Sequence, residues 1–217
     1  MNSAPPESAT AVVYVHGLWL SGHEAFMLRR RLQTERHYQW HNFAYRTVHI
    51  ALDQIADALN DSIAALSAPT VHLIGHSLGG LVILRCLQRH PRQPPGRVVF
   101  LGTPAVASRA ANGVARFRVG RALLGQAAVE GLLYGHERRW AHAHELGIIA
   151  GSQPLGLGRA VAEFTEPNDG VVAVTETRLP GATLHRLLPV SHTGMLLSAR
   201  VAHEVGNFLE QGRFDAG

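Results

Sequence analysis

The chain has 217 residues, of which 46% are hydrophobic and 17% charged, and its formal net charge is +4. This balance is typical of a globular protein with a full core, and it excludes a disordered chain. The basic residues occur in short groups without a zinc-finger, RNA-recognition or basic-zipper pattern, so we expect no nucleic-acid partner.

The start of the chain lacks the basic residues and apolar stretch of a secretory signal. No eighteen apolar residues follow one another anywhere, so we expect no transmembrane segment and a cytoplasmic protein. The prediction is one domain over residues 1–217, with a flexible tail over residues 1–10.

Strand-like and helix-like patterns alternate from residue 11 onwards. Apolar or β-branched runs predict strands over residues 11–15, 39–45, 70–74, 97–101, 146–150 and 183–188. Helical spacing and closing prolines predict helices over residues 24–35, 52–66, 78–90 and 193–211. The alternation predicts an α/β three-layer sandwich, in which a mainly parallel sheet of about six strands has helices on both faces.

A long stretch without a strand pattern follows residue 104. Residues 106–134 have helical spacing, and the connection is too long for an ordinary loop. We interpret residues 105–145 as a small helical cap beside the functional site. An enlarged crossover helix pair that only packs on the sheet is the alternative.

The stretch Gly75-His76-Ser77-Leu78-Gly79 lies between a predicted strand and a predicted helix. Gly-x-Ser-x-Gly in that context is typical of a nucleophile held on a sharp turn, where glycines let the strand and the helix approach closely. Ser77 is therefore the candidate nucleophile. Cys86, in the following helix, is the only cysteine and lies in an apolar run, which predicts a buried and inert thiol.

A serine hydroxyl needs a neutral imidazole to remove its proton and a carboxylate to orient that imidazole. Asp169, in the turn Asn-Asp-Gly, and His192, after the last strand, follow Ser77 in the order acid then histidine. The alternative is that Asp169 is an ordinary turn aspartate and that Glu163 or Glu166 is the acid. The rival to His192 is His185, which lies within a predicted strand.

The dipeptide His16-Gly17 follows the first strand, where a backbone amide can bind the oxyanion of the reaction. We assign the oxyanion hole to the backbone N–H groups of Leu18 and Leu78, with His16 ordering the loop.

Together, the motifs His16-Gly17, Gly75 to Gly80, Leu101 to Pro104, Asn168 to Val172 and Ser191-His192 resemble the small bacterial lipases and esterases of the α/β-hydrolase superfamily, over about residues 10–210. The resemblance implies a compact six-stranded sheet and hydrolysis of lipid or other acyl esters without a metal or cofactor.

We expect Ser77, Asp169 and His192 to cleave small-molecule or lipid carboxylic esters through an acyl-enzyme, with transient lipid-surface contact as an option. The candidates for substrate binding near the first loop are the apolar residues Trp19, Leu20 and Met27. Apolar residues of the insertion are further candidates, namely Phe117, Leu123 and Leu124. Thioester hydrolysis or acyl transfer by the same triad, and a non-catalytic ligand-binding protein, remain alternatives.

A metal site is the remaining alternative, because the chain has 14 histidines and the pair His142-x-His144. That pair lacks a nearby cysteine or Glu-x-x-His pattern. We interpret it as a solvated pair, for instance on a helix surface, and predict no metal.

Overall fold

The computed structural model describes residues 10–48, 50–105, 138–155 and 166–215. A parallel sheet of six strands, in the order β2-β1-β3-β4-β5-β6, forms the centre of this part of the chain. The strands are β1 (Ala11–Val15), β2 (Gln39–Phe43), β3 (Val71–His76), β4 (Val98–Leu101), β5 (Leu146–Gly151) and β6 (Leu184–Leu188). The predicted fold class, a parallel sheet with helices on both faces, is confirmed.

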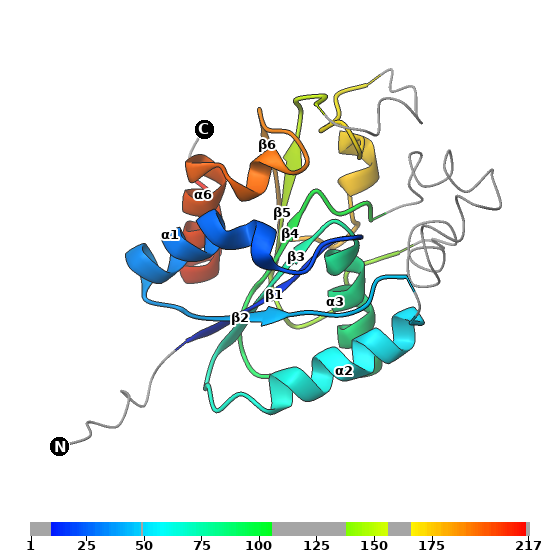
Figure 1. Ribbon diagram of the computed structural model, residues 1–217, viewed down its shortest axis with the longest axis vertical. Coiled ribbons are helices and arrows are strands. Elements are labelled where there is room, and N and C mark those ends of the chain that lie inside the picture. Colours follow the sequence, from blue (N-terminus) through cyan, green and yellow to red (C-terminus); the bar gives the residue numbers. More distant parts are fainter. Residues whose placement is uncertain (1–9, 49, 106–137, 156–165, 216–217) are drawn as a thin grey trace.

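The helices cover the two faces of the sheet in pairs (Figure 1). One face carries α1 (Phe26–Arg36) and α6 (Ala199–Gln211), and the other carries α2 (Leu52–Ala64) and α3 (Leu78–Arg89). The insertion predicted over residues 106–134, and with it Phe117, Leu123 and Leu124, lies outside the described residues, as does Glu163.

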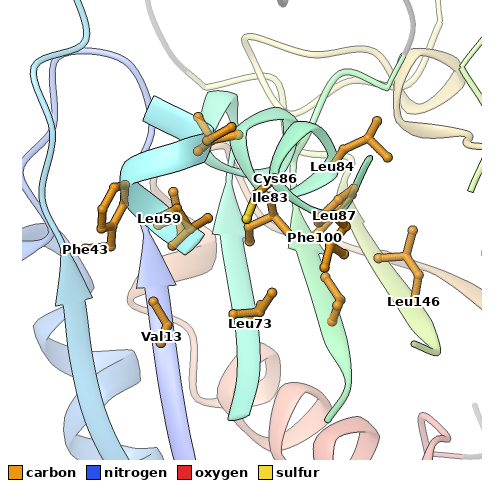
Figure 2. Close-up of a cluster of buried hydrophobic side chains, with 14 of the residues drawn as sticks. Val13, Phe43, Leu59, Leu73, Ile83, Leu84, Cys86, Leu87, Phe100 and Leu146 are labelled. Atoms are coloured by element: carbon orange, nitrogen blue, oxygen red, sulfur yellow. The ribbon is translucent and has the colours of Figure 1, made fainter. Parts of the chain in front are cut away.

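The four inner strands β1, β3, β4 and β5 read as largely apolar runs because both of their faces are buried, whereas the edge strands β2 and β6 are more polar and partly exposed. In β1, Val13 belongs to the core under α2 and α3, whereas Val12 and Tyr14 belong to the core under α1 and α6. Figure 2 shows the first of these cores, where strand residues such as Phe100 meet residues of α2 and α3. Cys86 lies in this core, and burial raises the pKa of its thiol to about 12, so the prediction of a buried cysteine is confirmed.

Two predicted helices begin later than expected. The first is preceded by a separate 3-10 turn, His23–Ala25, and α1 starts at Phe26. The last is divided into a 3-10 turn, Gly194–Leu196, and α6, because Ser198 has an extended backbone and its hydroxyl accepts a hydrogen bond from the amide of Val201 (3.3 Å). A serine in this geometry caps a new helix, which the apolar spacing alone does not reveal.

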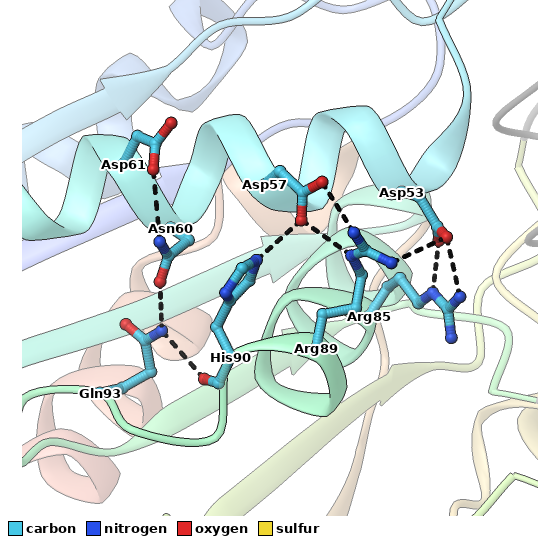
Figure 3. Close-up of polar contacts among 8 residues, drawn as sticks. All are labelled: Asp53, Asp57, Asn60, Asp61, Arg85, Arg89, His90 and Gln93. Atoms are coloured by element: carbon cyan, nitrogen blue, oxygen red, sulfur yellow. Dashed lines mark hydrogen bonds and ion pairs between the residues drawn. The ribbon is translucent and has the colours of Figure 1, made fainter.

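Helices α2 and α3 are joined by ion pairs as well as by the core. Figure 3 shows Arg85 with Asp53, and Arg89 with both Asp53 and Asp57. None of the helices within the described ranges is long and apolar enough to cross a membrane.

Candidate active site

Ser77 is the single residue between β3 and α3, so the motif Gly-x-Ser-x-Gly lies on a strand-to-helix turn. Its backbone has φ 53° and ψ −120°, a conformation that costs a residue with a side chain about 1–3 kcal/mol. The Ser77 amide donates a hydrogen bond to the carbonyl of Leu101 at the end of β4 (2.9 Å). The surrounding sheet thus holds a strained serine at the carboxyl edge.

The glycine spacing of this turn has a steric cause. A Cβ atom at Gly79 would overlap the carbonyl oxygen of Val15, and one at Gly75 would lie 2.5 Å from the Cα atom of Gly80. Strand β3, the first turn of α3 and the end of β1 therefore meet backbone against backbone. Only glycine permits this approach, which positions Ser77 at the positive end of the α3 dipole.

Asp169 and His192 are brought together from loops that lie 23 residues apart in sequence. His192 Nδ1 lies 2.7 Å from Asp169 Oδ2, and the His192 amide donates to the Asp169 carbonyl (2.9 Å). Because a carboxylate only accepts hydrogen bonds, Nδ1 carries the proton of a neutral His192. The lone pair of Nε2 is then available to accept a proton.

The loop around Asp169 is built to hold this carboxylate. Asp169 Oδ1 accepts hydrogen bonds from the amides of Val171 (2.9 Å) and Val172 (2.7 Å), which leaves Oδ2 for His192. Asn168 closes the turn by accepting from the Gly170 amide (3.0 Å). The same segment thus forms an Asn-Asp-Gly turn and supplies the partner of the imidazole.

Two residues place the Asp169–His192 pair next to the turn that carries Ser77. Gly102, directly after Leu101, has φ 55°, and a Cβ atom there would lie 3.0 Å from both Asp169 Oδ2 and His192 Nδ1. The ring of His76, the neighbour of Ser77, lies 4.7 Å from the ring of His192. The carboxyl ends of β3 and β4 and the last loop therefore meet at one site.

His76 is the third buried imidazole at this edge, beside His16 and His192. Its Nε2 lies 3.1 Å from the carbonyl oxygen of His192. Burial, with a smaller contribution from the nearby His192, lowers the pKa of His76 to about 3. His76 is therefore neutral at physiological pH and places no fixed positive charge beside His192.

The predicted oxyanion loop lies against Ser77, the candidate nucleophile. A Cβ atom at Gly17 would be 3.0 Å from Cβ of Ser77, and the Leu20 amide donates to the Gly17 carbonyl (3.3 Å) to close a turn. Leu18 lies inside this turn, and Leu78 is the first residue of α3. The assignment of their amides to the oxyanion hole stays a prediction.

The predicted substrate residues differ in exposure. Trp19 is 59% exposed and has a left-handed backbone (φ 60°), whereas Leu20 and Met27 are half-buried. A shallow hollow of about 620 Å³ lies on the outer side of α1, lined by Phe26, Arg29, Arg30, Gln33 and Thr34. It contains neither these residues nor Ser77, so it does not identify an acyl pocket.

The rival residues His185 and Glu166 make hydrogen bonds away from the Asp169–His192 pair. His185 Nε2 lies 2.8 Å from the hydroxyl of Thr177, and because that hydroxyl donates to the Val174 carbonyl, His185 is its donor. Glu166 lies three residues before Asp169, and its carbonyl accepts from Asn168 Nδ2 (3.0 Å). Asp169 is the carboxylate that His192 meets.

The helical setting suggested for His142 and His144 is wrong, because this segment is irregular. Each side chain packs half-buried against a neighbour. The His142 ring lies 4.9 Å from the ring of Trp140, and His144 Nε2 lies 3.0 Å from the Pro94 carbonyl. Within the described ranges, no three His, Cys, Asp or Glu side chains gather as a metal site would require.

Comparison with known proteins agrees with this architecture. Solved structures that are similar include a Bacillus licheniformis lipase, BlEst2 in its mature form (20% identity, TM-score 0.71, 96% of this chain and 93% of that chain). Others are the thioesterase RedJ of the prodiginine pathway in Streptomyces coelicolor (13%, 0.59, 95% and 90%) and the metagenomic carboxyl esterase MGS0156 (20%, 0.58, 87% and 65%). At these identities the likeness concerns the fold.

No curated protein sequence matches the chain significantly. A family model described as alpha/beta hydrolase fold, however, matches residues 10–149, which include β1 to β4, most of β5 and the turn at Ser77. With the strained serine between β3 and α3 on a parallel sheet, this match shows that the chain belongs to the alpha/beta hydrolase fold family.

Proposed function

We propose that the protein is a serine hydrolase that cleaves carboxylic esters through an acyl-enzyme, with Ser77 as nucleophile, His192 as general base and acid, and Asp169 as the carboxylate that orients His192. The observation that carries the proposal is the buried 2.7 Å contact between His192 Nδ1 and Asp169 Oδ2, beside the strained turn at Ser77. A ligand-binding protein has no need for this combination.

In the first half of the proposed reaction, Ser77 Oγ attacks the ester carbonyl while His192 Nε2 accepts the hydroxyl proton. The carbonyl oxygen becomes an oxyanion, which accepts hydrogen bonds from the amides of Leu18 and Leu78. One such donor contributes on the order of 3 kcal/mol to the stability of the transition state. The carbon–oxygen bond to the alcohol then breaks, and His192 returns the proton to the departing alkoxide.

In the second half, water replaces the alcohol. His192 removes a proton from water, the resulting hydroxide attacks the acyl carbonyl, and Ser77 departs with the proton. Asp169 stabilises the positive charge that His192 carries in each half. Trp19, Leu20 and Met27 are proposed to contact the acyl chain because Trp19 and Leu20 belong to the Gly17 turn and Met27 lies in the first turn of α1, the next helix.

The test is a panel of p-nitrophenyl esters and acyl thioesters of graded chain length, with wild type, Ser77→Ala and the control Ser67→Ala on the exposed end of the α2–β3 connection. We expect ester turnover that falls on the order of 10⁴-fold or more in Ser77→Ala and is unchanged in the control. A fluorophosphonate probe should label Ser77, identified by mass spectrometry.

Three outcomes would contradict the proposal. Turnover that survives Ser77→Ala would remove the nucleophile assignment. Absence of both turnover and labelling in wild type would favour a binding protein. Turnover confined to thioesters would keep the triad but change the substrate class.

A further inference from the structure

We infer that Tyr45 and Thr47, in the segment after β2, position the turn at residues 16–19 and thereby aim the Leu18 amide at the oxyanion. The inference rests on the proposed function, and it treats both residues as positioning residues that do not touch the substrate. Neither residue belongs to a recognisable sequence motif.

The sheet register explains why this segment reaches the turn. Strands β1 and β2 are parallel neighbours, and Val15 is paired with Phe43 at their carboxyl ends. The chain after Phe43 therefore runs beside the chain after Val15. Tyr45 and Thr47, which follow the polar edge strand β2, therefore support the loop next to Ser77.

Tyr45 holds the turn through His16. The Tyr45 hydroxyl donates to the His16 carbonyl (2.7 Å), and the Tyr45 amide lies 3.2 Å from His16 Nε2. The two rings stack at 4.3 Å with an interplanar angle of 13°. Because the amide is a donor, Nε2 of His16 must accept, and the imidazole proton must lie on Nδ1.

That proton has a partner in the turn itself. His16 Nδ1 lies 2.8 Å from the carbonyl oxygen of Gly17 and therefore donates to it. The carbonyl of Gly17 belongs to the same peptide group as the amide of Leu18, and a peptide group is planar. A hydrogen bond on this oxygen consequently restricts the direction in which the Leu18 N–H points.

Thr47 holds the other side of Leu18. The buried Thr47 hydroxyl accepts a hydrogen bond from the Trp19 amide (3.3 Å). Trp19 has φ 60°, which a bulky side chain adopts only where surrounding contacts enforce it. The peptide group before Leu18 is thus held by His16, which Tyr45 supports, and the peptide group after Leu18 is held by Thr47. The Leu18 N–H is therefore oriented before substrate arrives.

The experiment compares Tyr45→Phe with Tyr38→Phe, measured on a p-nitrophenyl ester. Tyr38 is buried and Tyr45 is partly buried, but among the described residues the Tyr38 hydroxyl has no hydrogen-bond partner. We expect kcat to fall roughly tenfold in Tyr45→Phe with KM within about twofold of wild type, because the lost contact aims a group used in the transition state. Tyr38→Phe should leave both constants unchanged.

A second pair of variants tests Thr47. Thr47→Val keeps the shape of the side chain but lacks the acceptor, and we expect kcat to fall about threefold, whereas Thr47→Ser keeps the acceptor and should restore kcat. An alkyl boronic acid, which forms a tetrahedral adduct with serine, gives the readout specific to the oxyanion. Its Ki should rise across the variants by the factor by which kcat/KM falls.

Unchanged kcat in both Tyr45→Phe and Thr47→Val, with an active wild type labelled at Ser77, would overturn this inference and leave the proposed function intact. Equal losses in Tyr38→Phe and Tyr45→Phe, or a boronic acid Ki that stays constant while kcat falls, would also overturn it. Should Tyr45→Phe fail to fold, the Thr47→Val and Thr47→Ser pair decides. A wild type without turnover or labelling would refute the proposed function itself.

Discussion

Two aspartate–histidine pairs in this molecule have the same separation and different surroundings. His192 Nδ1 and Asp169 Oδ2 are 2.7 Å apart with side chains 9% and 1% exposed, and His90 Nε2 and Asp57 Oδ1 are also 2.7 Å apart but 32% and 42% exposed. Figure 3 shows the second pair on the outer surface of α2 and α3, where Asp57 also binds Arg89.

The difference lies in what else surrounds each carboxylate. Asp169 is held by two backbone amides and bonds His192, whose ring lies beside that of His76, the neighbour of Ser77, whereas Asp57 is shared between an arginine and a histidine in contact with solvent. Solvent screens the interactions of the exposed pair. In the proposed mechanism, an Asp–His hydrogen bond is chemically useful only where burial and a nucleophile accompany it.

The largest contrast is expected from removing each carboxylate charge. Asp169→Asn should reduce kcat for ester hydrolysis by on the order of 10⁴-fold, because an amide cannot stabilise the imidazolium and favours the wrong His192 tautomer. Asp57→Asn should leave kcat within about twofold of wild type. Steady-state kinetics on one p-nitrophenyl ester measure both, and equal effects of the two substitutions would break the comparison.

The next contrast concerns packing. The buried site is assembled backbone against backbone at Gly79, where an added Cβ would overlap the Val15 carbonyl. We expect Gly79→Ala to lower the free energy of unfolding by about 3 kcal/mol. Gly206→Ala in α6 is the matched control, because its added Cβ would meet the flexible side chain of Arg36. Urea denaturation compares the two, and similar midpoints would show that the strand-to-helix turn at Ser77 tolerates a side chain at position 79.

The pH dependence of stability should separate the two regions. The pKa of buried His76 is about 3, below its value of 6.5 in the unfolded chain, so the unfolded chain binds more protons between these values. Stability is therefore lost as the pH falls below 6.5. At the surface, the hydrogen bonds from Arg89 and His90 lower the pKa of Asp57 from 3.8 to about 2. The contribution of Asp57 to stability is therefore lost only as the pH falls from 3.8 to about 2.

The test is the free energy of unfolding of wild type and His76→Gln, whose amide retains a donor for the His192 carbonyl. Between about pH 7 and about pH 5, wild type should lose about 2 kcal/mol more than the variant. His192, Asp169 and His16 face His76 in both proteins, so their own titration largely cancels. Parallel pH profiles would mean that His76 becomes protonated in the folded protein.

The smallest effect is expected at the surface pair itself. Arg89→Ala removes ion pairs to Asp53 and Asp57 that are in contact with solvent, so kcat should be unchanged and the melting temperature only slightly lower. The difference from wild type should shrink further in high salt. Differential scanning calorimetry at two salt concentrations checks this. A large, salt-independent fall in melting temperature would show that the contacts on the α2–α3 surface matter as much for stability as those at the site.

Much of the fold was predictable because each element carries its own periodicity. The buried strands β1, β4 and β5 were predicted to within one residue at each end, and β3 ends two residues later than predicted. The beginnings of α2 and α3 were also predicted, but those of α1 and α6 were not; at Ser198 the reason is that a cap depends on one side chain finding one amide. Glycine at position 102 could have drawn attention, since it directly follows a strand, but its closeness to His192 is visible only in three dimensions.

By itself, the sequence determined the alternation of strands and helices, the turn that carries Ser77, and the candidate acid and base, because apolar spacing and glycine sterics act between near neighbours. Only the tertiary structure decided which histidine meets Asp169 and that Tyr45 and Thr47 support the turn beside Ser77. These contacts join segments that are distant in sequence. They depend on strand order and register, which no local pattern of residues encodes.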